Sequence, residues 1–450
     1  MKLGQYSHIY FVGIGGIGMS ALARYFNALD KNIAGYDKTP STITNNLVNE
    51  GIEVIYDEEV SEIPKSFLDS ETTLVVYTPA VPISHPQLVY FNEHGFKVVK
   101  RSVALGLVTE NSICFAVAGT HGKTTTSTIL AHLLYECNVP LTAFLGGISE
   151  NFKSNYISKG YEVTVVEADE FDRSFLTLSP DFACITSMDA DHLDIYGATE
   201  SLEQAFKAFV QKLKPKGKLF VRKGLNLKGI SYAVDDSADY SVKNISIENG
   251  SYVFDVQTPH QLIKDVNFNL PGRHNLSNAL IALAMAIEYG CAPNSLASAL
   301  ASFKGVHRRF SIIHKSEEKV YIDDYAHHPT EIEAVHQAVT EMYPNQKVIV
   351  FFQPHLFSRT KDFADDFAQS LSKFDVVRLL EIYPARELPI PGITSDWLLS
   401  KVNAKDKKCI TKANMANEIK ETDATVILTL GAGDIGNEVQ QIKDYLSIAS

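Results

Sequence analysis

The stretch Ile113–Ser127, ICFAVAGTHGKTTTS, decides the fold of the region around it. Its apolar first part, Ile113–Ala118, predicts a buried strand, and apolar residues at helical spacing follow the Gly-Lys-Thr turn. A strand, a glycine loop and a helix N-terminus together form a cradle for phosphate, because backbone N–H groups and the helix dipole point at the anion. We expect Lys123 to reach the outer phosphates of a triphosphate and the Thr124 hydroxyl to ligate Mg²⁺.

This loop departs from the pattern GxxxxGK[ST], because Val117 stands where the first glycine belongs. The alternative interpretation is an ordinary strand-to-helix turn that contains Gly-Lys-Thr by chance. The order of strand, loop and helix favours the phosphate site.

The composition, 45% hydrophobic and 21% charged over 450 residues, is typical of globular proteins and predicts two or three domains. A formal net charge of −12 argues against nucleic acid as a partner. The five cysteines lack CxxC spacing, which favours reduced thiols in a cytosol. The N-terminus runs directly into a glycine loop, and the longest apolar run, Ala279–Ile287, is too short to span a bilayer. We therefore expect a cytoplasmic protein with no signal peptide and no membrane segment.

Strands alternate with helices in three blocks, which predicts an α/β protein with parallel, doubly wound sheets and ligands at the carboxyl ends of strands. We expect the three domains to cover residues 1–106, 107–307 and 308–450. Short alternating segments between residues 217 and 270 predict an antiparallel β portion in the central domain.

The first block contains a second glycine loop, GIGGIG, directly after the predicted strand 8–12. The spacing G-x-G-x-x-G, with Asp37 about twenty residues further on, is typical of a site for a dinucleotide or another diphosphate such as a UDP-sugar. The alternative is a tight turn that needs glycine only for packing. The candidate residues of this site are Gly13, Gly15, Gly16, Gly18 and Asp37.

Acidic residues follow the two strands predicted after the phosphate loop. Glu167 ends the first, and the second runs into Asp189-Ala190-Asp191-His192. Because both strand ends face the phosphate loop, we expect two metal ions there, with Glu167, His192 and Thr124 as candidate magnesium ligands. The alternative is that acidic residues decorate loops and His192 is a partly buried histidine without a ligand.

The third block presents His, Arg and Tyr side chains at its predicted strand ends, in the segments 323–331 and 353–360. Such residues suit a small molecule that carries a carboxylate, with Arg359 making a paired hydrogen bond. Two further strand ends, 383–387 and 431–436, are expected at the same edge.

Nine motifs in chain order resemble those of the Mur ligases. They are GIGGIGMSALA, GTHGKTTT, VVEADEFDRSF, DADHLDIYG, PGRHNLSNA, GVHRRF, DDYAHHPTEI, FQPHLFSRT and IYPARE. The resemblance implies a Rossmann-like N-terminal domain that binds a UDP-sugar, a central domain that binds ATP with Mg²⁺ or Mn²⁺, and a Rossmann-like C-terminal domain that binds an amino acid and closes over ATP. The motifs are most similar to those of the members that join L-alanine to the lactyl carboxylate of UDP-N-acetylmuramate through an acyl phosphate, a step of peptidoglycan precursor synthesis.

The resemblance also implies roles for individual residues. The ATP site would comprise Gly119, Thr120, His121, Gly122, Lys123, Thr124, Thr125, Asn275, Asn278, Arg308 and Asp324. The metal ligands would be Thr124, Glu167 and His192, and the alanine site would comprise Tyr325, His327, His355 and Arg359. Lys123, Glu167, His192 and His327 are the candidate catalytic residues, with His192 and His327 both open as the group that assists the amine.

Two positions stand apart from the family pattern. Leu356 occupies a place where the family often has arginine. Other Mur ligases carry a carbamylated lysine, which alanine-adding members usually lack, and Lys207 falls at a plausible distance after His192 for it. We expect Lys207 to be a surface residue of a helix. The alternatives in function are a ligase that adds a preformed tripeptide, a folylpolyglutamate synthetase, an NAD-dependent oxidoreductase and a nucleotide-binding regulator without activity.

Overall fold

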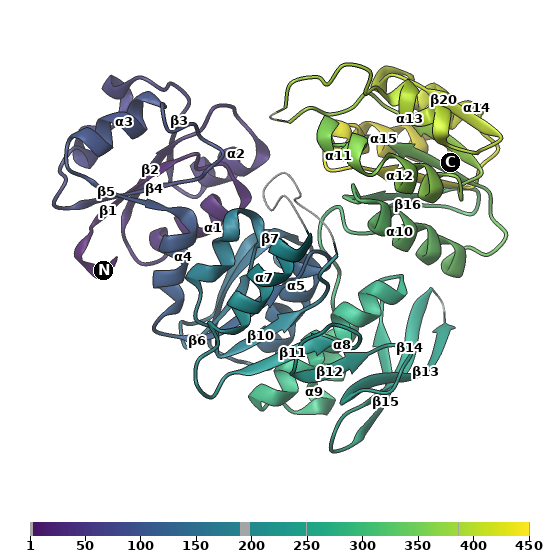
Figure 1. The fold of residues 1–450 in the computed structure, drawn as a ribbon, viewed down its shortest axis with the longest axis horizontal. Coiled ribbons are helices and arrows are strands. Elements are labelled where there is room, and N and C mark those ends of the chain that lie inside the picture. The colour runs from purple at the N-terminus through teal and green to yellow at the C-terminus, as the bar shows by residue number, and fades with distance from the viewer. Residues whose placement is uncertain (1–2, 190–198, 249, 386, 450) are drawn as a thin grey trace. The chain divides into compact units, whose positions relative to one another are not determined.

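Parallel strands with helical connections make up most of the chain in the computed structural model, which describes residues 3–189, 199–248, 250–385 and 387–449. The strands form three sheets of five, ten and six strands (Figure 1). The predicted α/β class is therefore confirmed.

The first sheet has the order β3-β2-β1-β4-β5, and its neighbouring strands all pair in parallel. Ile9 and Phe11 face a core shared with Leu22 of the first helix, whereas Tyr10 packs with Phe91 on the opposite face. The elements are β1 (His8–Val12), α1 (Ile17–Asn27), β2 (Asn32–Tyr36), α2 (Thr42–Asn49), β3 (Glu53–Ile55), β4 (Thr73–Tyr77), α3 (Pro86–Glu93), β5 (Lys97–Lys100) and α4 (Arg101–Thr109).

The second sheet has the order β15-β14-β13-β12-β11-β10-β6-β9-β7-β8. Its strands are β6 (Ile113–Ala118), β7 (Leu141–Ser149), β8 (Ser154–Ser158), β9 (Val163–Glu167), β10 (Phe182–Ile185), β11 (Lys218–Arg222), β12 (Ile230–Ala233), β13 (Tyr240–Glu248), β14 (Ser251–Gln257) and β15 (Leu262–Phe268). Its helices are α5 (Lys123–Glu136), α7 (Thr199–Val210), α8 (Arg273–Tyr289) and α9 (Pro293–Ala301).

Strand direction in this sheet differs in part from the expectation. β11 and β12 pair in parallel, and so do β12 and β13, whereas the alternating segments of this region predicted antiparallel pairing. Alternation reports which side chains face the core, and it carries no information on the direction of the neighbouring strand.

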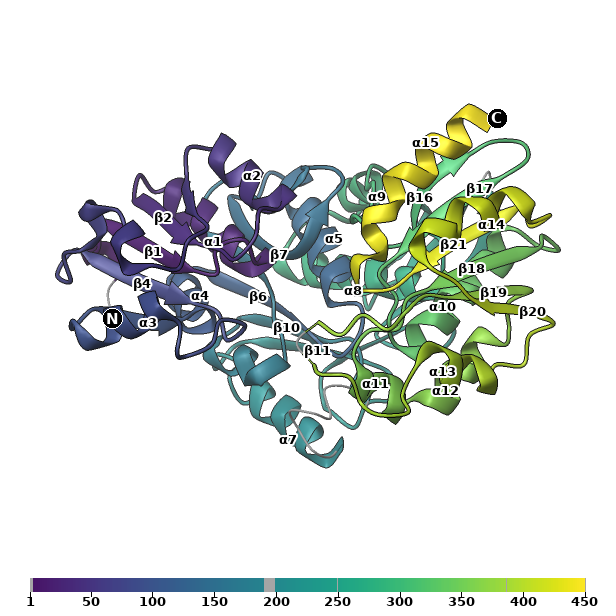
Figure 2. The same ribbon diagram turned by 90° about the horizontal axis from the view of Figure 1, so that it is seen from above.

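The third sheet has the order β16-β17-β21-β18-β19-β20, in which β16 runs antiparallel to β17 and the remaining pairs are parallel. Helix α15 packs along β16 (Figure 2). The strands are β16 (Ser311–Lys315), β17 (Val320–Asp324), β18 (Val348–Phe352), β19 (Val376–Leu379), β20 (Asp406–Cys409) and β21 (Val426–Leu430). The helices are α10 (Pro329–Met342), α11 (Phe357–Asp362), α12 (Ala364–Leu371), α13 (Ser395–Lys401), α14 (Met415–Glu421) and α15 (Val439–Ala449).

Contacts along the chain define two compact units. The first unit comprises Met1–Val242, Val256–Ile263 and Asn278–Phe303, and the second comprises Lys243–Asp255, Lys264–Ser277 and Lys304–Ser450. The predicted domain borders after residues 106 and 307 stay a prediction.

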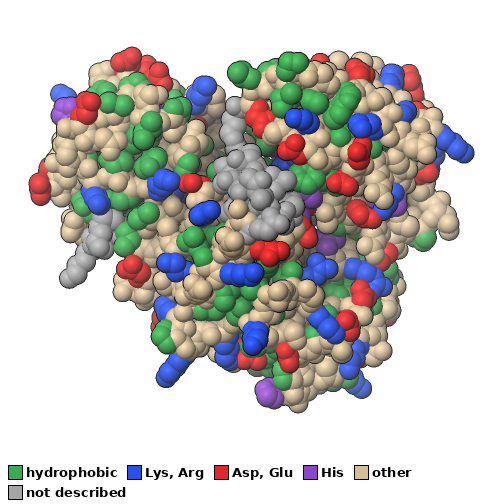
Figure 3. All heavy atoms as spheres, in the orientation of Figure 1, with side chains coloured by type: hydrophobic (Ala, Val, Ile, Leu, Met, Phe, Trp, Pro, Cys, Tyr) green, Lys and Arg blue, Asp and Glu red, His purple; other side chains and the backbone are tan. Residues whose placement is uncertain are grey.

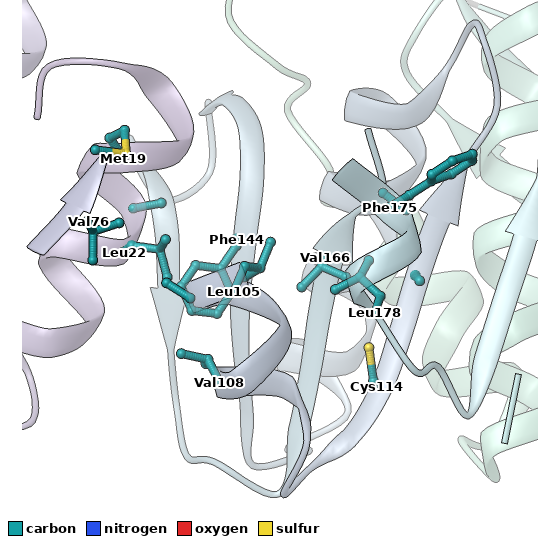
Figure 4. Close-up of a cluster of buried hydrophobic side chains, with 14 of the residues drawn as sticks. Met19, Leu22, Val76, Leu105, Val108, Cys114, Phe144, Val166, Phe175 and Leu178 are labelled. Carbon is teal, nitrogen blue, oxygen red and sulfur yellow. The ribbon is translucent and has the colours of Figure 1, made fainter. Parts of the chain in front are cut away.

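Within the first unit, the first two sheets share one core. Leu22 of α1, Leu105 and Val108 of α4, and Phe144 of β7 lie side by side in this core (Figure 4). Hydrogen bonds also join the two sheets beside this core. The fully buried Asn155 of β8 donates to the Ile17 carbonyl and to the Ser20 hydroxyl of α1. The helix that follows the first glycine loop is thereby attached to the sheet that carries the phosphate loop.

Candidate active site

The first glycine loop joins β1 to α1 and is closed by hydrogen bonds from its own backbone. The N–H groups of Gly13 and Ile14 both donate to the Tyr36 carbonyl, over 2.8 and 2.9 Å. The N–H of Gly15 donates to Oδ2 of Asp37 over 2.7 Å. Gly13 has a φ of +91°, a region that favours glycine. Asp37 therefore lies against the loop, as the spacing predicted.

Arg101, which was not predicted, lies beside the same loop. A β-carbon on Gly18 would be 2.9 Å from Nη1 of Arg101, so the guanidinium packs directly on the start of α1. Arg101 begins α4 immediately after β5, at the carboxyl edge of the sheet. The strand that precedes it, Lys97–Lys100, was not predicted, so no strand end marked this arginine in the sequence. Its charge suits a diphosphate at this edge.

The phosphate loop lies between β6 and α5, and glycine is needed at both of its turns. Gly122 is the N-cap of α5 with a φ of +82°. Gly119 has a φ of +129°, and a β-carbon there would be 2.1 Å from Oγ1 of Thr186. The hydroxyl of Ser187 accepts from the His121 N–H over 2.9 Å, and the Thr120 N–H donates to the Ser187 carbonyl over 3.2 Å. The residues after β10 therefore fix the loop in place.

Lys123 extends back over the loop instead of into solvent. Its Nζ donates to the carbonyls of Gly119 and Thr120, over 2.8 and 3.3 Å, and to Oε1 of Glu170 over 2.8 Å. The side chain of Glu170 is fully buried, and that of Lys123 is 12% exposed. Glu170 was not predicted, although it lies three residues after Glu167 in the motif VVEADE.

The charge of Lys123 is maintained by its neighbours. Burial lowers the pKa of the Lys123 ammonium, but the carboxylates of Glu170, Asp169 and Glu167 outweigh this effect and hold the pKa above its ordinary value. A permanently charged lysine at a phosphate loop is suited to a polyphosphate ligand.

Glu167 is the last residue of β9 and lies opposite Val117 in the register of β6 and β9. The pairing places its carboxylate at the strand edge from which the phosphate loop begins. Gly146 of β7 packs against it, because a β-carbon on Gly146 would be 2.2 Å from Oε2 of Glu167. Thr124 is the second residue of α5 and is buried.

The Glu167 carboxylate and the Thr124 hydroxyl are suitable ligands for Mg²⁺, which prefers oxygen ligands and retains several waters. The glycine at position 146 leaves room for the Glu167 carboxylate at this edge. The third predicted ligand, His192, lies outside the described residues. Among the residues that the structure describes, no group of three or more His, Cys, Asp or Glu side chains forms a metal site.

The two asparagines predicted near adenine fall in different units. Asn278 belongs to the first unit, and its Oδ1 would be 2.5 Å from a β-carbon on Gly122, so it lies at the phosphate loop. Asn275 belongs to the second unit, where its amide donates to the Pro271 carbonyl over 2.7 Å.

Aromatic rings and histidines gather at the carboxyl edge of the third sheet. His327 lies between two other rings, with its centroid 5.4 Å from Tyr325 and 5.9 Å from His355. His355 stacks on Tyr383 with centroids 5.7 Å apart. The structure therefore brings Tyr325, His327 and His355 together, as the sequence predicted, and adds Tyr383.

The backbone of the segment 355–359 is strained at one residue. Leu356, the position that departs from the family pattern, has a φ of +70° and a side chain that is 5% exposed. Its N–H donates to the Tyr383 carbonyl over 2.9 Å, which holds this strained backbone beside the ring cluster. Arg359 follows in α11 and is buried.

Arg308 and Asp324 organise the start of the third sheet. Nε of Arg308 donates to Oδ2 of Asp323 over 2.9 Å, and Nη2 donates to the Gly431 carbonyl over 2.7 Å. Asp324 accepts from the N–H groups of Phe310 and Ala326, over 2.6 and 2.7 Å. Burial raises the pKa of Asp324 to about 6. Asp324 is the last residue of β17, at the strand end where it was predicted, and Arg308 precedes β16.

Lys207 lies on α7 with its side chain 50% exposed and its Nζ 3.8 Å from Oε2 of Glu203. This is the surface position that we expected. Basic and acidic side chains are interspersed over the face shown in Figure 3. None of the helices in the described part of the chain is long and apolar enough to cross a membrane.

Three domain families match the chain in succession. The family described as "Mur ligase family, catalytic domain" matches residues 8–112, the Mur ligase middle domain matches residues 117–286, and "Mur ligase, glutamate ligase domain" matches residues 308–434. A curated protein of Flavobacterium psychrophilum, named UDP-N-acetylmuramate–L-alanine ligase, is 59% identical over 446 residues, which are 99% of each chain. The chain belongs to the Mur ligase family.

Other Mur ligases are similar over the same length. A protein of Flavobacterium johnsoniae with the same name is 56% identical, again over 99% of each chain. The crystal structure of a UDP-N-acetylmuramate-alanine ligase from Thermotoga maritima has a TM-score of 0.84 at 28% identity and covers 98% of this chain and 100% of its own. A murein peptide ligase from Psychrobacter arcticus shares the fold, with a TM-score of 0.70 at 21% identity and 98% of each chain covered.

Proposed function

We propose that this chain is an ATP-dependent ligase that joins L-alanine to the lactyl carboxylate of UDP-N-acetylmuramate during peptidoglycan precursor synthesis. The observation that carries the proposal is the 59% identity, over nearly the whole length of both chains, with a curated protein of that name. The charged phosphate loop at Lys123 supplies the ATP site that the reaction needs.

The three predicted domains, 1–106, 107–307 and 308–450, would divide the substrates between them. Gly13, Gly15, Gly16, Gly18 and Asp37 would bind the UDP-sugar, with Arg101 as an added contact to its diphosphate. Tyr325, His327, His355 and Arg359 would bind L-alanine. We place the reaction in the cytoplasm, because all five cysteines are free thiols.

The first chemical step transfers a phosphoryl group. The lactyl carboxylate attacks the γ-phosphorus of ATP, the bond to the β-phosphate oxygen breaks, and an acyl phosphate and ADP result. Lys123 and the N-terminal N–H groups of α5 stabilise negative charge on the transferred group. Thr124, Glu167 and His192 would hold Mg²⁺, which supplies further positive charge at the phosphates.

The second step forms the amide. The neutral amine of L-alanine attacks the acyl carbon, and the tetrahedral intermediate expels phosphate. Nδ1 of His327 is 2.9 Å from the Tyr325 carbonyl, so the tautomer with hydrogen on Nδ1 leaves Nε2 as the basic nitrogen. His192 remains the other candidate for this role. Water must be excluded from the site, since it would hydrolyse the acyl phosphate.

Phosphate release with ATP, UDP-N-acetylmuramate and candidate amino acids, each omitted in turn, tests the proposal. We expect release only when all three are present, with L-alanine as the amino acid and the amide identified by mass. A preferred tripeptide acceptor would indicate the ligase that adds a preformed peptide. Nucleotide binding without turnover under any combination would indicate a regulator and would contradict the proposal.

A further inference from the structure

Two strand ends of the third sheet that the proposed reaction leaves unused meet at Tyr383. Tyr383 follows β19, and Gly433 follows β21 in the segment GAGDIG. Strand β18, which leads into His355, lies between β21 and β19 and is parallel to both. All three residues belong to the second unit. Tyr383 and Gly433 therefore lie at the edge where the ring cluster forms.

The backbone of Tyr383 is fixed on both sides. Its N–H donates to the Pro354 carbonyl over 2.8 Å, and its carbonyl accepts from the Leu356 N–H over 2.9 Å. A parallel bridge between His355 and Tyr383 thus continues the pairing of β18 with β19 beyond the ends of both strands. The ring of Tyr383 stacks on His355 with 21° between the two planes, so its position is set by its neighbours.

Gly433 packs against the base of the same side chain. A β-carbon on Gly433 would be 2.8 Å from both Cβ and Cγ of Tyr383 and 2.4 Å from Oε1 of Gln353. The buried Gln353 is held in place, because Oε1 accepts from the Ile435 N–H over 2.9 Å and Nε2 donates to Oδ1 of Asp434 over 2.7 Å. Gly433 has an ordinary φ of −84°, so this position needs glycine for space and not for its backbone conformation.

The four rings of the cluster differ in their surroundings. The Tyr325 ring has the guanidinium carbons of Arg308 and Arg309 at 5.4 and 5.1 Å from its centroid. The two histidines carry polar nitrogen atoms. Tyr383 contacts a stacked ring and a glycine and is partly exposed, so it offers apolar ring surface at the edge where the amino acid is expected.

We propose that Tyr383 is a specificity-determining residue, whose ring limits the size of the amino acid side chain that the second unit accepts. The inference rests on the proposed function, since it refines the alanine site of that reaction. An apolar ring suits a methyl group, which has no hydrogen-bonding atoms, and it excludes longer side chains by contact. Gly433 is a positioning residue, because it acts on the amino acid only through Tyr383.

The test measures kcat/KM by phosphate release for glycine, L-alanine and L-2-aminobutyrate, with saturating ATP and UDP-N-acetylmuramate. Tyr383→Ala should raise the ratio of L-2-aminobutyrate to L-alanine by about tenfold or more, because one methylene group in an apolar pocket changes kcat/KM by about 10- to 200-fold.

Gly433→Ala should have the opposite effect on selectivity. Its methyl group displaces the Tyr383 ring toward the amino acid, because Gln353 on the other side is held by its two hydrogen bonds. The value of kcat/KM for L-alanine should therefore fall by about tenfold relative to glycine, which lacks the methyl group. A general loss of stability would lower both values together and leave their ratio unchanged.

Two control variants separate the ring from other effects. Tyr383→Phe keeps the ring and should keep the ratios of the unaltered protein. Tyr343→Ala removes a partly buried tyrosine at the end of α10 in the same unit, and it should also leave the ratios unchanged. If Tyr383→Ala does not fold, Tyr383→Leu takes its place, since it keeps an apolar side chain and removes the flat ring.

The possible failures are distinguishable. Turnover of L-alanine with unchanged ratios in Tyr383→Ala and Gly433→Ala would overturn this inference alone. Altered ratios in Tyr343→Ala would overturn it as well, because the effect would then not depend on the ring. Turnover of the unaltered chain with none of the three amino acids would overturn the proposed function, and this inference with it.

Discussion

The ammonium nitrogen of Lys123 lies 2.8 Å from each carboxylate oxygen of Glu170. This pair is buried at the phosphate loop, and two backbone carbonyls of the loop also accept from the same ammonium. The lysine is thus fixed and charged before any nucleotide binds. Glu170 is a positioning residue in this arrangement, since it acts on phosphate only through Lys123.

We predict that Glu170→Gln lowers the free energy of unfolding of the nucleotide-free protein by about 3 kcal/mol, because the buried ammonium of Lys123 loses the one carboxylate that it contacts directly, and Asp169 and Glu167 compensate its charge only in part. Denaturant unfolding measures this change. The matched control is Asp172→Asn, which removes an exposed ion pair with Lys100 and should cost less than about 1 kcal/mol. Equal stability of the two variants would contradict the role of Glu170.

Lys123→Ala should abolish ATP-dependent amide formation and leave the binding of UDP-N-acetylmuramate unchanged. The charge that offsets the transferred phosphoryl group is lost, whereas the first glycine loop is a separate site. Phosphate release and calorimetric titration of the UDP-sugar measure the two effects. Turnover near that of the unaltered protein would show that the phosphate loop has been assigned wrongly.

Gly146→Ala should increase the Mg²⁺ concentration needed for half-maximal activity by about tenfold or more, because the new methyl group displaces the Glu167 carboxylate. Phosphate release over a range of Mg²⁺ concentrations gives this value. Gly4→Ala is the control, since no atom lies within 4 Å of a β-carbon at that position. Identical Mg²⁺ curves for the two variants would exclude Glu167 as a metal ligand.

The stability of the second unit should fall as the pH is lowered from 6.5 to 4. Burial lowers the pKa of His274 from 6.5 to about 4, and the ring lies in the first turn of α8, where the helix dipole also opposes a positive charge. The unfolded chain therefore binds a proton in this range that the folded chain does not, which costs roughly 3 kcal/mol by pH 4.

Thermal unfolding at pH 7.5 and pH 5 measures this dependence on pH. His274→Gln should show a smaller difference between the two pH values, whereas the exposed His260→Gln should behave like the unaltered protein. The same pH dependence in all three proteins would exclude His274 as its source.

Asn155→Ala should destabilise the first unit by about 2–3 kcal/mol. Its amide donates to the Ile17 carbonyl and the Ser20 hydroxyl, and its Oδ1 accepts from Nη1 of Arg24, so alanine removes three hydrogen bonds at a fully buried position. Asn32→Ala, at an exposed contact with His8, is the control and should change the unfolding midpoint little. A midpoint for Asn155→Ala equal to that of the control would disprove the bridging role.

The strands that precede the two glycine loops could be predicted, because they are short and apolar and end directly before the loop. The predicted strands 8–12 and 113–118 agree with β1 and β6 at both ends. The hairpin of β7 and β8 was not predicted, because LTAFLGGIS and SNYIS combine glycine, polar and apolar residues without a clear period. Their place in the sheet depends on neighbours that are distant in sequence.

The candidate site likewise contains residues that could be predicted from the sequence and residues that could not. Asp37 and Glu167 were predicted from their place at strand ends, a local signal. Glu170 and Arg101 were not predicted, because their roles depend on contacts with Lys123 and with Gly18, 47 and 83 residues away. Contacts over such separations leave no periodic trace in the sequence.

The hydroxyl of Tyr252 donates to Oε2 of Glu341 over 2.6 Å, and Nε of Arg273 donates to Oε1 of the same carboxylate over 3.0 Å. These contacts explain why segments 243–255 and 264–277 group with the C-terminal part of the chain. A truncation that ends at residue 303 would remove Glu341 and leave a tyrosine and an arginine without their acceptor. The chain passes between the units after residues 242, 255, 263, 277 and 303, so after a single proteolytic cut at one of these crossings the remaining crossings still connect the two units. Producing either unit separately would require circular permutation or new linkers.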